Sequence, residues 1–132
     1  MTPEASAFLR KARKHLGRAR IMLGVSLHED AGRAAYLASF HAAQAFIFEN
    51  IGKALKTHQG VQSEFFRLTK DDLRLGPDLR VFLSQAYNLK AIADYEEGED
   101  SPIFAQRSVA AVETAARFVD CIARLLGETA ST

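Results

Sequence analysis

Two small groups of polar residues in the first half of the chain have the types and spacing needed for chemistry. His41 and Gln44 lie three residues apart inside an otherwise apolar stretch, so a helix would present both on one face. Lys56, Thr57 and His58 follow in a short segment that contains several polar residues. An imidazole exchanges a proton near neutral pH, and an ammonium group neutralises a phosphate. The two groups therefore predict proton transfer or anion binding beside the core.

Each group also has a structural interpretation. A single histidine on an apolar stripe is more often a hydrogen-bonded core residue than a catalytic one, and a buried glutamine beside it shares its partners. Thr57 can be the N-cap of a short helix, with His58 packed against it. Because irregular turns carry function more often than buried helices do, His58 is the better placed of the two histidines.

Other site chemistries find no matching pattern in the sequence. The four histidines have no mutual spacing of three or four residues, and no Glu-x-x-His or His-x-x-x-His pair exists, so we expect no metal site. Glycine-rich phosphate loops and nucleophile elbows are absent. The single cysteine, Cys121, is expected to be an inert helical residue, and no cofactor is expected.

Length and composition predict one helical domain over residues 1–132. The chain is 48% hydrophobic and has a net charge of +1, which is typical of a folded globule. One cysteine excludes an internal disulfide and fits the reducing cytoplasm. We expect no signal peptide, because residues 1–20 contain no continuous apolar run, and no membrane-spanning segment.

Basic residues are concentrated near the start of the chain. Lys11, Lys14 and Arg18 lie on one side of the first expected helix. They form either a solvated face or a surface for nucleic acid or an acidic partner, although no aromatic residue interleaves with them as a stacking platform.

The apolar spacing predicts helices only. One begins at the Thr2 cap, the next runs from an Asp30 cap to near Gly52, a short one follows over 61–68, and two more begin near Asp78 and at residues 101–102. The last ends near residue 127. No segment has the period of two that a strand needs. The expected fold is an all-α, antiparallel up-and-down bundle of four long helices plus one short helix.

Three segments together resemble a known family. They are AAYLASFHAAQAFI, then KTHQGV before a helix that contains phenylalanines, then a helix that ends in KAIADY. This order and spacing resemble the HEPN domains, in particular the small stand-alone UPF0332-like group that partners minimal nucleotidyltransferases. The resemblance covers roughly residues 5–127, and the Thr-His turn and the Ala-Asp-Tyr sequence are its most specific parts.

The resemblance implies a bundle like the substrate-binding subunit of a nucleotidyltransferase. It further implies a homodimer in the cytoplasm that acts in a toxin–antitoxin pair or in RNA-linked defence, with a nucleotidyltransferase partner and RNA or a nucleotide as ligand. In this hypothesis Lys56 and Lys90 contact phosphate. The expected binding groove is lined by His41, Gln44, Lys56, Thr57, His58, Lys90, Asp94 and Tyr95.

Many members of the family are metal-independent ribonucleases with an Arg-x4–6-His motif. Here the one match is Arg10 to His15 in the first helix, away from the place where the family carries it. Lys90 occupies the position of the usual arginine and no histidine follows within six residues, so the resemblance favours a protein that is not an enzyme. Two alternatives stay open: a ribonuclease toxin with His58 as base and Lys90 as phosphate binder, and a purely structural dimer.

Overall fold

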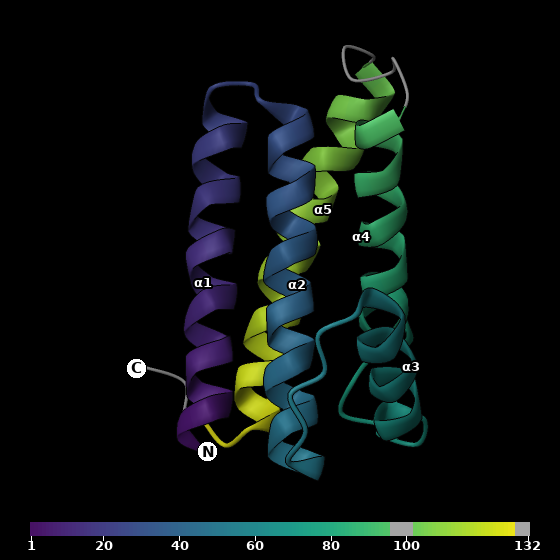
Figure 1. The fold of residues 1–132 in the computed structure, drawn as a ribbon. Helices are drawn as coiled ribbons and strands as arrows, with labels where there is room; N and C mark the ends of the chain where they lie inside the picture. Colours follow the sequence, from purple (N-terminus) through teal and green to yellow (C-terminus); the bar gives the residue numbers. More distant parts are fainter. Residues whose placement is uncertain (96–101, 129–132) are drawn as a thin grey trace.

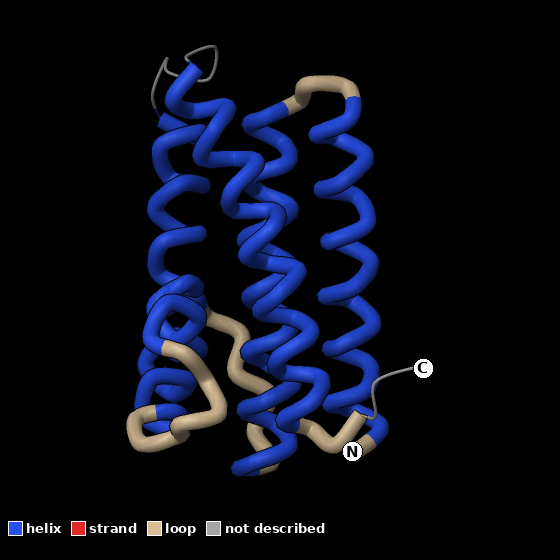
Figure 2. The backbone as a smooth tube through the Cα atoms, turned by 180° about the vertical axis from the view of Figure 1, so that it is seen from behind, coloured by secondary structure: helices blue, strands red, loops and turns tan. Residues whose placement is uncertain are grey.

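The chain folds into a bundle of helices that lie side by side (Figure 1). The computed structural model describes the backbone of residues 1–95 and 102–128 and the side chains of residues 1–88 and 104–128. No strand occurs in these ranges, and the view from behind shows helices joined by loops (Figure 2). The expected all-α bundle of four long helices and one short helix is confirmed. The helices are α1 (Pro3–Gly24), α2 (His28–Ile51), α3 (His58–Thr69), α4 (Pro77–Tyr95) and α5 (Pro102–Leu125).

Helix α1 begins as its sequence predicts. The Thr2 hydroxyl accepts a hydrogen bond from the Ala5 amide at 3.1 Å, and proline occupies the first position, where its missing N–H costs nothing. The Thr2 amide donates to the Glu49 carboxylate of α2 at 2.7 Å. This bond ties the start of α1 to the end of α2.

Helices α1 and α2 pack through a seam of small side chains. The α1 side of the seam alternates alanine and leucine, and the α2 side is almost entirely alanine. Because alanine has little volume, the two backbones approach closely and leave no room for larger groups. The fully buried members, all 0% exposed, are Ala5, Ala12, Ala19, Ala31, Ala35, Ala38, Ala42 and Ala45.

Helix α2 is the central element, and it is buried on several sides. It contacts each of the other four helices, which explains why its sequence is apolar nearly all round. It ends at Gly52, whose φ of 68° is the left-handed conformation that glycine adopts without strain. The expected Asp30 cap is wrong: Leu27 holds the cap position, and Asp30 lies in the first turn. The turn after α1 brings the Leu27 amide onto the Met22 carbonyl at 2.8 Å, which starts the helix earlier.

Helix α3 begins at His58, because Thr57 caps it. The Thr57 hydroxyl accepts from the Gly60 amide at 3.0 Å. A Cβ atom at residue 60 would lie 2.7 Å from that hydroxyl, so a larger residue there would displace the capping hydroxyl. Gly60 therefore belongs to the first turn of α3 rather than to the preceding loop, and the capping interpretation of Thr57 describes its contact.

An aromatic cluster joins α3 to the long helices. Phe65 is fully buried, with its ring 5.7 Å from that of Phe46 on α2 and 5.5 Å from that of Phe118 on α5. The last helix packs against α2, α1 and α4. Across the described ranges, no helix combines the length and the apolar composition needed to cross a membrane.

Candidate functional site

His58 is held between α2 and α4 by two aromatic neighbours. Its ring stacks on that of Tyr87 from α4, with centroids 3.5 Å apart and planes 17° apart. Its Nδ1 atom lies 2.7 Å from the hydroxyl of Tyr36 on α2. Tyr36 and Tyr87 also contact each other, with ring centroids 5.5 Å apart. Three helices thus fix the orientation of one imidazole, and we call these three residues the His58 cluster.

The hydrogen bond in the His58 cluster has a defined direction. Tyr36 is buried, and burial followed by the charge of Tyr87 raises the pKa of its hydroxyl, so the hydroxyl keeps its proton. Its one hydrogen bond in the described part of the chain is to His58. A buried hydroxyl proton needs an acceptor, so Tyr36 donates and His58 Nδ1 accepts. In the neutral imidazole the proton is therefore on Nε2.

The hydrogen bonds of His41 place its proton on Nδ1, the ring nitrogen that accepts in His58. The Gln44 amide nitrogen donates to the Leu55 carbonyl at 2.8 Å, which turns the Gln44 oxygen toward His41 Nδ1 at 2.7 Å. That oxygen can only accept, so His41 carries its proton on Nδ1 and leaves Nε2 as the acceptor. The predicted pair of polar residues on α2 is therefore a fixed network that ties the loop before α3 to α2.

His41 lies beside a second histidine that comes from α1. The His15 and His41 rings stack with centroids 5.2 Å apart and planes 24° apart. Burial, followed by the charges of His41, Arg18, Lys14 and Lys11, lowers the pKa of His15. Burial also lowers the pKa of His41, with Lys11 adding to the effect, although the hydrogen bond to Gln44 opposes it.

These lowered pKa values predict weaker stability in mild acid. The unfolded chain takes up protons on His15 and His41 at a pH where the folded chain does not, so the free energy of unfolding should fall as pH drops below about 6.5. Urea unfolding between pH of about 7.5 and 5 measures this slope. The double variant His15→Gln/His41→Gln should show a flatter slope over this window, and an unchanged slope would contradict the assignment.

The predicted site residues fall into two places. His41 stacks on His15 of α1 and Gln44 joins it to the loop before α3, whereas His58 packs against α4. Thr57 caps α3 and Lys56 is exposed. The remaining three, Lys90, Asp94 and Tyr95, belong to α4, but their side chains lie outside the described residues.

Sequence reasoning missed the aromatic residues that hold His58. A core position accounts for both in the sequence: Tyr36 shares an apolar stripe with Phe40 and Ile47, and Tyr87 lies in a stripe beside Leu83. The sequence contains one signal for this contact: a tyrosine hydroxyl that becomes buried needs a hydrogen-bond partner. Nothing in the local sequence identifies that partner, because it is 22 positions away.

Two open cavities lie away from both histidine groups. A groove of about 390 Å³ runs between α4 and α5, with Phe82, Ala86 and Ala111 among its lining residues. Another, of about 520 Å³, includes Arg74 and Cys121 in its wall. In the part of the chain that can be described, no three His, Cys, Asp or Glu side chains come together as metal ligands would.

Comparison with known proteins identifies one family. A family model described as "HEPN domain" matches residues 5–125 of the chain. A search of curated proteins found no match.

Proposed function

Because this chain belongs to the HEPN domain family, we propose that it is a binding module, the accessory and substrate-binding partner of a minimal nucleotidyltransferase. In this proposal it acts in the cytoplasm, in a toxin–antitoxin pair or in RNA-linked defence. His58 and its neighbours hold the RNA or nucleotide that the partner enzyme acts on. Lys56, exposed beside the Thr57 cap, supplies a positive charge for phosphate.

The contact between the Tyr36 hydroxyl and His58 Nδ1 is the observation that carries this proposal. With Nδ1 accepting from Tyr36 at 2.7 Å, His58 presents an Nε2–H group, which is a hydrogen-bond donor. Phosphate and carbonyl oxygens are acceptors that match it. In the free protein the His58 Nε2–H group can donate to another acceptor. A ligand oxygen that takes the place of this acceptor leaves the imidazole ring in the same position.

The same hydrogen bond supports binding over ribonuclease catalysis. A general base must offer an unprotonated nitrogen to the hydroxyl that it deprotonates, and in neutral His58 that nitrogen already accepts from Tyr36. The Arg10 to His15 match does not form a cluster either, because Arg10 donates to Ser6 while His15 stacks on His41. Without added metal, an RNA cleavage assay should give equal activity for wild type, His58→Ala and Lys90→Ala.

Purification with native partners tests the binding proposal. Tagged wild-type protein should recover a nucleotidyltransferase or nucleic acid, and His58→Ala should recover several-fold less. Tyr36→Phe should also weaken recovery, because it removes the bond that selects the His58 proton position. Lys70→Gln, an exposed change on the α3–α4 connection, is the matched control. Wild-type protein that recovers neither would refute the proposal.

A homodimer is the second part of the proposal. The groove between α4 and α5 has an apolar floor that includes Phe82, Ala86 and Ala111. An apolar strip of this kind is where a second copy can pack. Light scattering should give twice the mass of one chain, whereas Ala110→Glu, which puts a charge in the groove, should give the mass of one chain.

A further inference from the structure

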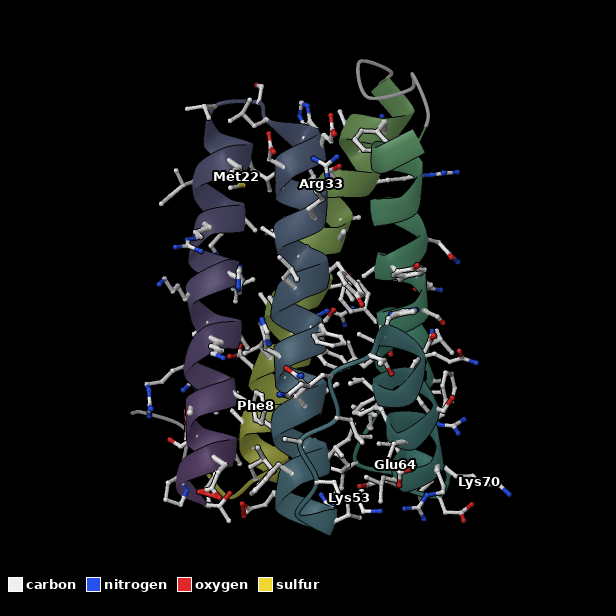
Figure 3. The ribbon with its side chains drawn as sticks, viewed as in Figure 1. Phe8, Met22, Arg33, Lys53, Glu64 and Lys70 are labelled. Atoms are coloured by element: carbon white, nitrogen blue, oxygen red, sulfur yellow. The ribbon has the colours of Figure 1, made fainter. Side chains whose placement is uncertain are left out.

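A stripe of positive charge runs along the exposed side of α1, away from the buried seam, with His15 at its edge toward α2. Lys11, Lys14 and Arg18 are three and four residues apart, which places them on one side of the helix. Residues 5–24 contain no Asp or Glu. Phe8 lies near the lower end of α1 and Met22 near the upper end, and the stripe lies between them (Figure 3).

These three cations have no acidic partner, unlike five arginines elsewhere in the described residues. Within the part of the chain that the structure describes, none of the three forms an ion pair with a carboxylate, and the Lys11 ammonium lies 5.9 Å from the Phe8 ring centroid. Intramolecular ion pairs therefore do not neutralise the stripe. Paired basic residues elsewhere are Arg13 with Glu128, Arg33 with Glu29, Arg67 with Glu64, Arg74 with Asp72 and Arg117 with Asp78.

The stacked histidines extend this surface from α1 onto α2. The charges of Lys11, Lys14 and Arg18 all act on His15, and that of Lys11 also acts on His41. The groups that face the two rings are therefore these three cations from α1, together with Gln44 from α2. We call Lys11, Lys14, His15, Arg18 and His41 the α1–α2 basic surface.

We propose that the α1–α2 basic surface binds the phosphate backbone of a nucleic acid, at a site separate from the His58 cluster. Successive turns of α1 are about 5.4 Å apart, so its charges follow a row of phosphates that are spaced along a strand. Such contacts hold the backbone irrespective of base sequence.

The composition of the surface favours a nucleic acid over an acidic protein. Protein–protein interfaces have an apolar centre inside a polar rim. No large exposed hydrophobic residue lies between Lys11 and Arg18, and the exposed Ile21 and Val25 lie beyond the end of the stripe. Two imidazoles lie along the edge of the stripe instead, and when protonated they donate to phosphate.

Fluorescence anisotropy with labelled oligonucleotides tests the proposal. Wild-type protein should bind at low salt, and single-stranded RNA and duplex DNA as separate probes distinguish the two sources of the phosphate backbone. The triple variant Lys11→Gln/Lys14→Gln/Arg18→Gln should bind at least about tenfold more weakly, and its slope of log affinity against log salt should flatten by about 2 to 3. Binding should also tighten as pH falls toward about 5.5, because phosphate favours protonated His15 and His41.

A control variant removes the same charge elsewhere. Arg20→Gln/Lys53→Gln/Lys70→Gln neutralises three exposed residues. Arg20 lies on the opposite side of α1, and Lys53 and Lys70 follow α2 and α3 (Figure 3). It should bind as wild type does. Equal loss in both triple variants would show a nonspecific charge effect and overturn the site, as would no wild-type binding to either probe at low salt. Competition by polyglutamate as effective as that by RNA would assign the surface to an acidic protein instead.

The test of the α1–α2 basic surface does not depend on the function proposed for the His58 cluster. The triple variant Lys11→Gln/Lys14→Gln/Arg18→Gln should therefore lose the same factor in RNA affinity in the wild-type background and in the His58→Ala background. Loss of nucleotidyltransferase recovery in His58→Ala, with that factor unchanged, would separate the failure of one site from that of the other.

Discussion

Phe65→Ala is expected to lower the free energy of unfolding by about 3–5 kcal/mol, the range for removing a large aromatic side chain from a core. Phe65 is 0% exposed and its ring contacts Phe46 and Phe118, so the substitution removes contacts with both α2 and α5. The neighbouring helices cannot close the cavity, because each is held by its own caps and packing. Urea unfolding followed by circular dichroism measures the loss.

The adjacent phenylalanine provides the control. Phe66 is only partly buried, and the Arg80 guanidinium lies 4.7 Å from its ring centroid. Phe66→Ala should cost about 1 kcal/mol, because water can fill the space that the ring leaves. Equal costs at the two positions would show that Phe65 does not anchor α3 to the bundle.

Ala12→Leu is expected to destabilise the chain by about 1–3 kcal/mol, although leucine is the better buried residue in most cores. Ala12 is 0% exposed in the seam between α1 and α2, and three extra carbon atoms there force the two helices apart. A lower midpoint of urea unfolding with an unchanged slope would show that stability alone has changed.

A second alanine-to-leucine change serves as the reference. Ala54 is exposed in the loop between α2 and α3, where leucine meets no tightly packed helix, so Ala54→Leu should alter stability by no more than about 0.5 kcal/mol. If Ala12→Leu were equally mild, the seam would be looser than its burial indicates.

Helix positions could be predicted from the sequence because the signals that set them are local. The Thr2 cap, the glycine at 52 and Pro77 each act within one turn of the helix end that they define. Asp30 failed as a cap because the turn before it, not the residue, decides where α2 begins. Which residue becomes the N-cap depends on the backbone geometry of the preceding turn, and the amino-acid composition does not specify that geometry.

The candidate site was only partly predictable. His41 with Gln44, and His58, were identified as unusual polar residues, and each makes a specific contact. Their separation onto different sides of α2 follows from how α1 and α4 pack around that helix, and periodicity within one helix does not contain this information. Tyr36 and Tyr87 could not be identified from the sequence, because each lies on an apolar stripe that a core position explains.

Synthesis of the chain exposes α2 for some time before its last partner exists. Helix α2 is complete at Ile51, but α5, which covers one of its apolar faces, ends at Leu125. At about 5–20 residues per second, the intervening roughly 75 residues take about 4–15 s to make. During this interval the nascent chain presents an apolar helix at the ribosome exit, so we expect chaperones that bind such segments to engage it before α5 emerges.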